Sequence, residues 1–487
     1  MRLVISASMA NTPSLASVID SFSKANALLW LTKAGGPIAS KAPTITELGD
    51  VPETDDQTFL VAPLDECVAP HNMAQKIMRV VERDSAIESC GLATARLDHF
   101  GQLEHLLTLR SHTGLSRLLA QRNWQAEDFR EVVLKRYARG IERVQNVRTA
   151  AIFGAQRLGQ LVLQSLQAEG VTVQAFIDND HRKIGTLLSN IPVCGLPQIT
   201  DKELPVVIAT TKYTNSIALQ LEKEGFSNVL PYSVMSLVDP VLYPEEIPYL
   251  GIQEDFAHHT AEYVGLFICL ADDKSRKVLD GLLNYRLDYD TRNAEAVADE
   301  YLRQYFDAEL IKFSGDDVFV DLCGYDGDTT EKFIQYCGGV YRKIYLFEPD
   351  NNLLQAAVKR LKDNKQIEYI QAGAYSKDGE LRFAASGRTN GAISESGELV
   401  IPVRKIDSVV VEPPTLIKID IEGAETEALL GAANLLRTAR PRLAIAAYHS
   451  APDLWQLADV VRGMNPTYKF YLRHYSESGL ESVIYAL

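Results

Sequence analysis

The sequence predicts a multidomain α/β protein whose sheets are mostly parallel. Its 487 residues exceed what one ordinary hydrophobic core holds, so about three domains are expected. Strand-like apolar runs alternate with helical patterns along most of the chain, which favours parallel sheets covered by helices. Hydrophobic residues make up 46% and charged residues 23%, values typical of globular proteins, so wholesale disorder is excluded.

Charge and motif content exclude several classes of protein. Acidic residues exceed basic ones by 15 (64 against 49), which argues against a dedicated nucleic-acid binder. The 6 cysteines form no CxxC pair and the 9 histidines no HExxH pair, so we expect no metal centre and a reducing compartment. No uncharged apolar run approaches about 18 residues and the start lacks a signal-peptide core, so we expect no membrane span and a cytoplasmic location.

Residues 1–113 are expected to form an N-terminal α/β domain of unclear role. Its expected strands are the apolar runs at 3–5, 28–31 and 58–62. Asp65 and Glu66 follow the last run, a layout that faintly resembles a nucleotide-sugar-binding glycosyltransferase half, in which acids after a strand hold a metal. The favoured alternative is a diverged α/β interaction domain. Residues 114–146 then form one charged linking helix.

Residues 147–240 are expected to form a Rossmann-like module. A buried-strand run at 150–153 leads into Gly154 and a helix, and the next strand ends in Asp178. A glycine at the first turn and an acid at the next strand tip are typical of nucleotide-binding halves, although Gln156 replaces the second glycine of the fingerprint. The stretch "FIDNDHRKIGTLLSNIPVCGLPQI" resembles modules that accompany sugar-modifying enzymes, which implies a nucleotide or nucleotide-sugar ligand. The favoured interpretation is nevertheless an empty structural module.

The most informative part is 250–487, which begins with a polar helical lead-in at 250–315. Asp321 lies in one expected strand and Glu348 follows the next, 27 residues later, as suits consecutive strands of one βαβ unit. Both carboxylates should emerge at the carboxyl edge of a parallel sheet, beside a glycine-containing turn. Two acids there disfavour a phosphate and favour a nucleoside with a cationic group, such as the sulfonium of S-adenosylmethionine.

Five motifs in this part occur in a characteristic order: "FVDLCGYDGDTT", "YLFEPD", "AGAYS", "KIDIEGAE" and "ARPRLAIAAYH". With them, residues 316–487 resemble the FkbM-type methyltransferases, a family of S-adenosylmethionine-dependent O-methyltransferases. The resemblance implies a Rossmann-like methyltransferase fold with a seven-stranded, mostly parallel sheet whose last strand is antiparallel. It also implies S-adenosylmethionine as the cofactor.

The resemblance assigns roles to individual residues. The implied cofactor-binding residues are Asp321, Gly324, Gly327, Glu348, Ala372, Gly373, Ala374 and Asp420. Among them, Glu348 would hold the ribose hydroxyls, and residues 372–374 would lie near the adenine. Asp420 and Glu422 would lie close to the methyl group and the acceptor. Alternatively, either acid could cap the helix that begins near Ala424.

One position departs from the family pattern, which usually has glycine where this chain has Cys323. A cysteine tolerates a positive φ poorly, so we expect Gly324 to take the strained conformation of the turn. This departure would weaken cofactor binding or activity. We expect Cys323 itself to be a packing residue and not a nucleophile, because no histidine lies nearby in the sequence.

The C-terminal tail adds candidates on the acceptor side. The expected substrate-binding residues are Glu422, Tyr448, Asp453, Arg473 and His474. His449 follows a strand at the same sheet edge as Glu348, so it is a candidate general base, with Asp420 as the second catalytic candidate. The alternative is that His449 and His474 only form local hydrogen bonds.

The leading hypothesis is an O-methyltransferase acting on a hydroxyl group. The favoured acceptor is a sugar in a glycan, glycolipid or nucleotide-sugar. The sugar follows from family association alone. The alternatives are methyl transfer to a small secondary metabolite, a catalytically weak cofactor-binding scaffold of a glycan-modifying complex, and a dehydrogenase using the Gly154 turn. The expected partner is a sugar or glycan acceptor, and a homo-oligomer or a glycan-biosynthesis complex is left open.

Overall fold

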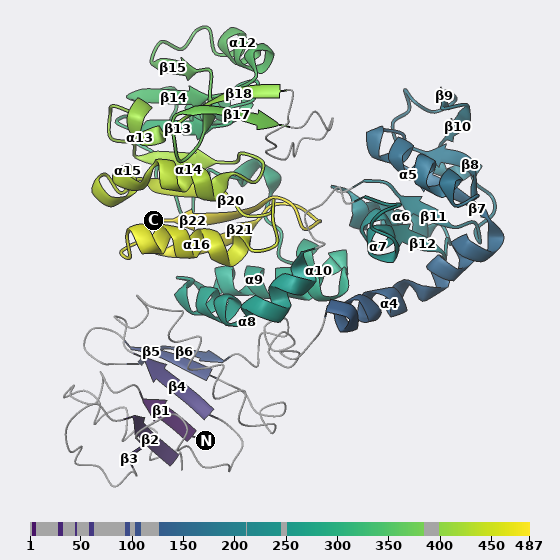
Figure 1. The fold of residues 1–487 in the computed structure, drawn as a ribbon, viewed down its shortest axis with the longest axis horizontal. Helices are drawn as coiled ribbons and strands as arrows, with labels where there is room; N and C mark the ends of the chain where they lie inside the picture. The colour runs from purple at the N-terminus through teal and green to yellow at the C-terminus, as the bar shows by residue number, and fades with distance from the viewer. Residues whose placement is uncertain are drawn as a thin grey trace.

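The computed structural model contains three main β-sheets, and helices connect them (Figure 1). The structure describes residues 126–210, 212–244, 251–383 and 399–487, together with six strands between residues 2 and 108. The expected acids Asp65 and Glu66 and the first part of the linking helix lie outside the described residues. The multidomain α/β class predicted from the sequence is confirmed.

The N-terminal sheet has the order β3-β2-β1-β4-β5-β6. Its strands are β1 (Arg2–Ile5), β2 (Leu28–Thr32), β3 (Thr44–Ile45), β4 (Thr58–Ala62), β5 (Ala93–Leu97) and β6 (Leu103–Thr108). All neighbouring strands pair in parallel except β5 and β6, which pair antiparallel. The three strands expected from apolar runs are therefore β1, β2 and β4, which are direct neighbours.

The second sheet belongs to the Rossmann-like module and has the order β12-β11-β7-β8-β10-β9. Its elements are α4 (Ala126–Val147), β7 (Thr149–Phe153), α5 (Arg157–Ala168), β8 (Thr172–Ile177), β9 (Leu187–Leu188), β10 (Ile191–Cys194), β11 (Val206–Ile208), α6 (Thr214–Lys223), β12 (Val229–Pro231) and α7 (Tyr232–Val238). A side chain at Gly154 would lie 2.7 Å from the carbonyl oxygen of Ala209, and the φ of Gly154 is 119°. A Cβ at Gly159 would lie 2.0 Å from the carbonyl oxygen of Gly154, so this glycine lets α5 pack closely on the sheet.

A helical layer joins the module to the C-terminal domain. It consists of α8 (Ile252–Cys269), α9 (Asp273–Asp288), α10 (Thr291–Glu295) and a 3-10 turn at Tyr301–Arg303. The sequence pattern at 250–315 predicted helices here. α4 packs against α8 and α9, while α9 packs against strand β21 (Phe470–His474) of the next sheet. One apolar cluster runs through α4, α8, α9, α10 and β21, and Arg136 of α4 pairs with Asp290 at 2.6 Å. The module and the C-terminal domain therefore share a continuous core.

The C-terminal sheet has seven strands in the order β15-β14-β13-β19-β20-β22-β21. These are β13 (Val318–Leu322), β14 (Lys343–Phe347), β15 (Ile367–Ile370), β19 (Leu416–Ile419), β20 (Arg442–Ala446), β21 (Phe470–His474) and β22 (Ser482–Ala486). The last strand, β22, runs antiparallel to both of its neighbours, as predicted. A separate three-stranded sheet contains β16 (Gly373–Ala374), β17 (Gly379–Phe383) and β18 (Leu399–Arg404).

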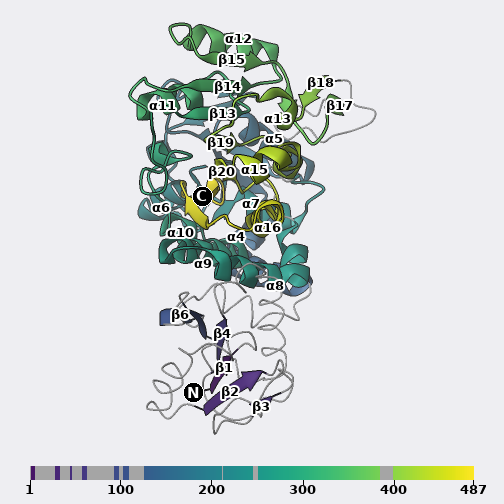
Figure 2. The same cartoon turned by 90° about the vertical axis from the view of Figure 1, so that its left-hand side faces the viewer.

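Helices cover both faces of the seven-stranded sheet, with α11 on one face and α13, α15 and α16 on the other (Figure 2). The helices are α11 (Asp328–Tyr336), α12 (Asn351–Arg360), α13 (Ile406–Val409), α14 (Glu425–Gly431), α15 (Ala433–Thr438) and α16 (Asp453–Met464). Strands β13, β14 and β19 are buried along almost their whole length, as their near-continuous apolar sequences require. Among the described residues, no helix combines the length and apolar character needed to cross a membrane.

Candidate active site

A buried lysine supports the turn that follows β13. Lys418 Nζ donates to the carbonyl oxygens of Leu322 (3.1 Å) and Cys323 (3.0 Å) and lies 3.3 Å from Asp321 Oδ1. Although burial disfavours its charged form, the Asp321 and Asp420 carboxylates hold the pKa of Lys418 above its ordinary value. Asp321 also accepts a 2.7 Å hydrogen bond from the hydroxyl of Thr330. Asp321 is fully buried and supports the turn through its contacts with Lys418 and Thr330. Its contact with the cofactor stays a prediction.

The prediction that Gly324 takes the strained, positive-φ conformation of the turn was wrong. Cys323 itself has a φ of 62° and Tyr325 a φ of 49°, whereas Gly324 is outside the left-handed region. Gly324 is required for another reason, since a Cβ there would lie 2.5 Å from Leu346 Cγ of the neighbouring strand. Gly327 has a φ of 88° and stands directly before α11. Close contact between the turn and β14, rather than a positive φ, thus selects the glycine at 324.

Glu348 lies against this turn at the carboxyl edge of the sheet. Its carboxylate accepts the backbone N–H groups of Tyr325 (3.0 Å) and Asp350 (2.9 Å), and the Cys323 thiol lies 3.5 Å away. Burial raises the pKa of the Glu348 carboxyl above its ordinary value. A carboxylate so placed has acceptor capacity left for hydroxyl groups. Residues 372–374 follow β15, the neighbour of β14, at the same edge.

Asp420 directly follows β19 and is surrounded by tyrosines. Tyr305 Oη donates to Asp420 Oδ2 at 2.7 Å, and Tyr448 Oη lies 3.4 Å from Oδ1. Burial and the Asp420 charge raise the pKa of both phenols well above the ordinary value. Glu425, and neither Asp420 nor Glu422, accepts the backbone N–H groups of Ile421 and Gly423 before α14, so capping hydrogen bonds do not explain these two acids. Asp420 is a charged acceptor held at the mouth of the site.

His449 lies at the centre of the site, between three carboxylates. Its Nδ1 lies 2.9 Å from Glu425 Oε1, and its Nε2 lies 3.4 Å from Asp420 Oδ1 and 3.6 Å from Glu422 Oε2. Glu425 Oε1 is itself fixed by the backbone N–H groups of Ile421 and Gly423. Burial alone would lower the pKa of His449, but Glu425, Asp420 and Glu422 together raise it to about 9. Glu425 therefore orients the imidazole so that Nε2 faces the other two acids.

The same cluster has the donor types of a divalent-cation site. Asp420, Glu425 and His449 each offer one ligand atom, and these atoms lie within 4.8 Å of one another. Glu425 Oε1, however, already accepts two backbone hydrogen bonds and contacts His449 Nδ1. The charges of the cluster are also balanced in part by the imidazolium form of His449. The described geometry is that of an ion-paired carboxylate–imidazole cluster, and the absence of a metal centre stays a prediction.

Three other predicted substrate-binding residues lie apart from this cluster or are engaged elsewhere. Asp453 accepts hydrogen bonds from the backbone and hydroxyl of Ser450 at the start of α16, and burial with the nearby Glu425 raises its pKa to about 6. Arg473 pairs with Asp272 at 2.7 Å, on the side of α9. His474 is fully buried, which lowers its pKa to about 4, and contacts Ser482 on the adjacent strand. These contacts explain the three side chains structurally, and a role in substrate binding stays a prediction for each.

Sequence reasoning missed four residues of the site: Tyr305, Lys418, Glu425 and Glu481. Lys418 had a readable signal, because a lysine inside the apolar strand "LIKI" must find a buried partner. Glu425 belongs to the recognised motif "KIDIEGAE" but was read as the start of a helix. Tyr305 and Glu481 reach the site from distant parts of the chain, which no local pattern reveals.

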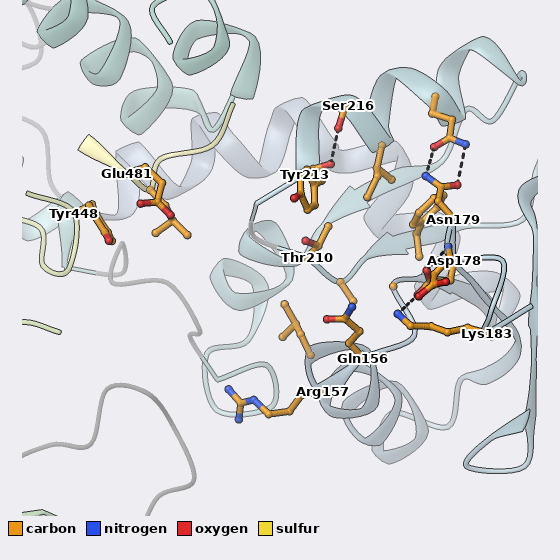
Figure 3. Close-up of a pocket in the computed structure, with 18 of the residues that line it drawn as sticks. Gln156, Arg157, Asp178, Asn179, Lys183, Thr210, Tyr213, Ser216, Tyr448 and Glu481 are labelled. Carbon is orange, nitrogen blue, oxygen red and sulfur yellow. Dashed lines mark hydrogen bonds and ion pairs between the residues drawn. The ribbon is translucent and has the colours of Figure 1, made fainter. Parts of the chain in front are cut away.

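A cavity of about 850 Å³ opens beside this cluster, between the module and the C-terminal domain (Figure 3). From the C-terminal domain it is lined by Glu422, Tyr448, His449, Leu480 and Glu481. The residues Gly154, Asp178 and Ala209, each directly after one parallel strand of the module, line the opposite side. The carboxyl edges of two parallel sheets therefore face the same cavity, and such edges are where open α/β sheets bind ligands.

Comparison with known proteins decides the nature of the C-terminal domain. Residues 319–472 match the family model of the methyltransferase FkbM domain. The C-terminal domain is an FkbM-type methyltransferase. The resemblance seen in the five sequence motifs is thereby confirmed, and with it S-adenosylmethionine-dependent methyl transfer as the activity of this domain. A search of curated proteins finds no match to the chain.

Solved structures agree with the fold. Methyltransferase FkbM from Methylobacillus flagellatus KT has a similar fold, with a TM-score of 0.59 and 22% identity, over 77% of this chain and 97% of that chain. An rRNA methylase from Streptococcus thermophilus has 17% identity and a TM-score of 0.24, over 36% of this chain and 86% of that one. Fibrillarin from Aeropyrum pernix, solved with S-adenosyl-L-methionine, has 15% identity and a TM-score of 0.24, over 36% of this chain and 67% of that one. Only the first similarity is high enough to support the architecture.

The residues of the FkbM-type domain fit its cofactor, S-adenosylmethionine. Glu348 presents a carboxylate beside the turn, where ribose hydroxyls can donate to it. Asp420 presents a second carboxylate at the tip of β19, which suits a cationic sulfonium. Lys418 neutralises Asp321 beneath the turn, so the acids left to meet the cofactor are Glu348 and Asp420. These residues would hold the nucleoside and the charged centre of the cofactor.

Proposed function

We propose that the protein transfers a methyl group to a hydroxyl of a sugar, carried by a glycan, a glycolipid or a nucleotide-sugar. The observation that carries the proposal is the position of His449. Its Nε2 faces Asp420 and Glu422 in the wall of a polar cavity, while Glu425 holds its other nitrogen. An imidazole in that position can take a proton from an acceptor hydroxyl.

The hydroxyl acceptor follows from the chemistry that His449 can perform. When bound, S-adenosylmethionine supplies an electrophilic methyl group on a sulfonium, so that an O–C bond forms as the C–S bond breaks. The hydroxyl proton passes to His449 Nε2, provided that the imidazole is neutral. Glu425 then stabilises the resulting imidazolium through Nδ1. Placement of the acceptor oxygen in line with the breaking bond contributes most of the rate enhancement.

The polar lining of the cavity supports a sugar as the acceptor. Of the five described lining residues contributed by the FkbM-type domain, only Leu480 is aliphatic. Glu422 and Glu481 offer carboxylate oxygens, and Tyr448 offers a hydroxyl. Carboxylates accept strong hydrogen bonds from neighbouring hydroxyl groups, which a sugar ring presents in series. A largely apolar secondary metabolite would leave these groups without partners, at a cost in binding energy.

The test is incubation of the purified full chain with isotope-labelled S-adenosylmethionine and a glycan extract from the source cells. Mass spectrometry then locates the label. The proposal predicts a labelled O-methyl sugar with the native protein and none with the His449→Gln variant. Label on a small metabolite would support that alternative instead. Label only on protein or nucleic acid would refute a sugar acceptor.

A cofactor-binding scaffold remains the second candidate because of one observation. Cys323 has a φ of 62°, a conformation that costs a non-glycine residue about 1–2 kcal/mol. A scaffold would bind S-adenosylmethionine in calorimetry but would show no methyl transfer to any fraction of the extract. Methyl transfer at a rate dependent on His449 would exclude it.

A further inference from the structure

We propose that the cavity between the module and the FkbM-type domain binds a sugar joined to a nucleoside diphosphate, with the nucleotide on the module and the sugar beside His449. This inference rests on the proposed function, because it names the acceptor class of that site. It concerns residues of the module that methyl transfer itself does not use.

Fixed contacts hold the two walls together. Ser216 Oγ of the module donates to Glu477 Oε1 at 2.7 Å, and Thr291 Oγ1 donates to Asn215 Oδ1 at 3.1 Å. Lys212 Nζ lies 4.2 Å from the centre of the Tyr301 ring. Together with the shared apolar core, these contacts keep the module edge facing the methyltransferase edge. A ligand that fills the cavity would therefore contact both edges at once.

The module wall suits an anionic group at the turn after β7. Because no side chain fits at Gly154, a ligand can approach the backbone there closely. The first turn of α5 contains Arg157 and no acid, and the side chain of its N-cap residue, Gln156, makes no capping hydrogen bond. Gln156 and Arg157 lie on the cavity side (Figure 3). An amide, a guanidinium and a helix N-terminus together favour a diphosphate.

Further along the same wall the groups suit a nucleoside. The Asp178 carboxylate is held by the Ala155 N–H and Lys183 Nζ, each at 2.9 Å, and these bonds lower its pKa despite burial. The side-chain amides of Asn179 and Gln220 exchange two hydrogen bonds, at 3.0 and 3.2 Å. A carboxylate at this strand tip is the position that accepts ribose hydroxyls in nucleotide-binding halves. The amide pair offers further donors and acceptors to a base.

The opposite wall suits the sugar. Glu481 accepts a 2.6 Å hydrogen bond from Gln304 and lies with Tyr448 across the cavity from the module residues (Figure 3). The cavity volume of about 850 Å³ is within the range of sites that enclose a whole small-molecule ligand. The second nucleotide of a dinucleotide would lie against the acidic residues Glu422 and Glu481, where the cavity has no second nucleotide-binding βαβ half. A mononucleotide-linked sugar therefore fits this cavity better than a dinucleotide does.

The experiment is calorimetric titration of the full chain with UDP, GDP, ADP and dTDP, and in parallel with NAD. We expect one nucleoside diphosphate to bind in the micromolar range. The Arg157→Glu variant should weaken that binding at least about tenfold, because it replaces a charge-assisted hydrogen bond with repulsion. The matched control is Arg143→Glu, the same charge change at an exposed position of α4, which should leave binding unchanged.

The outcomes separate this inference from the proposed function. The inference is overturned if none of the four nucleotides binds, if Arg157→Glu and Arg143→Glu behave alike, or if NAD alone binds. S-adenosylmethionine is titrated into the same samples, and its binding should be unaffected by either variant. Cofactor binding without nucleotide binding would overturn the inference and leave the proposed methyl transfer standing. Slower hydrogen exchange of residues 154–160 in the presence of the bound nucleotide would locate it on the module.

Discussion

Glu425 Oε1 lies 2.9 Å from His449 Nδ1, and this contact determines how the imidazole faces the cavity. The Glu425 carboxylate pairs with the Nδ1 side of the ring, which leaves Nε2 on the side of Asp420 and Glu422 as the atom that meets a ligand. Both residues are almost completely buried, although Glu425 begins α14 and His449 lies in the loop that follows β20. The pair has the arrangement of an oriented general base, and several predictions depend on it.

Replacing His449 by glutamine should lower kcat by about 10²–10⁴-fold, the usual contribution of a general base. The affinity for S-adenosylmethionine should change little, because the cofactor contacts assigned above are made by Glu348 and Asp420. The measurement is initial rate with labelled cofactor together with calorimetric binding. An unchanged kcat would remove His449 from the reaction.

The rate should depend on pH through His449. A base works in its deprotonated form, and a pKa of about 9 leaves only roughly 1% of the imidazole neutral at pH 7. We therefore expect kcat to rise about tenfold per unit between pH 7 and pH 9 and then to level off. Glu425→Gln removes the nearest carboxylate, so the pKa of His449 should fall and the rising limb should move to lower pH. An identical pH profile in Glu425→Gln would contradict the assigned pairing.

The Lys418–Asp321 pair should be important for stability. Lys418→Met leaves the fully buried Asp321 carboxylate without its cation, which should cost about 3–5 kcal/mol of unfolding free energy. Adding Asp321→Asn to that variant should recover part of the loss, because the buried charge is then gone. Denaturant unfolding of the three proteins measures this. A Lys418→Met variant as stable as the native chain would show that the pair does not support the turn.

The two neighbours in the cofactor turn should respond differently to alanine. Gly324→Ala places a Cβ 2.5 Å from Leu346 Cγ, so the turn must shift and S-adenosylmethionine should bind at least about tenfold more weakly. Cys323→Ala keeps the existing Cβ and should stay within about threefold of native affinity, as the matched control. Calorimetry distinguishes the two variants. Equal losses would show that the thiol, and not the close packing, matters.

Removing divalent cations should leave methyl transfer unchanged. The sequence predicted no metal centre, and Glu425 Oε1 already accepts two backbone hydrogen bonds and pairs with His449. The check is the initial rate after dialysis against EDTA, with and without added Mg²⁺ or Mn²⁺. A loss of rate that a metal restores would turn the cluster into a cation site.

Local sequence patterns predicted most of the C-terminal fold. The strands β13, β14 and β19 are apolar runs buried on both faces, and the acids Glu348 and Asp420 follow directly after two of them. Strand ends of a parallel sheet share one edge, so their proximity could be expected from the sequence alone. The position of Gly154 and Asp178 at the carboxyl ends of β7 and β8 in the module was predictable for the same reason.

Other features needed the three-dimensional structure. Tyr305 reaches Asp420 across 115 residues of sequence, and Gln304 reaches Glu481 across 177. The left-handed conformation of Cys323 was assigned to the wrong residue, because the close approach of Leu346 to Gly324 is a tertiary contact. The cavity depends on how the module packs against the helical layer, which no periodicity encodes. These features depend on contacts between residues far apart in the sequence, which local sequence patterns do not reveal.

The most direct test of the account is the transfer of label from S-adenosylmethionine to a sugar hydroxyl by the native chain, compared with Glu348→Ala and His449→Gln. We predict an O-methylated sugar with the native protein, weak cofactor binding with Glu348→Ala, and normal cofactor binding without transfer with His449→Gln. Glu368→Ala, an exchange of another acid in the same sheet at β15, should behave as native. Failure of the native chain to bind S-adenosylmethionine, or full transfer by His449→Gln, would contradict it.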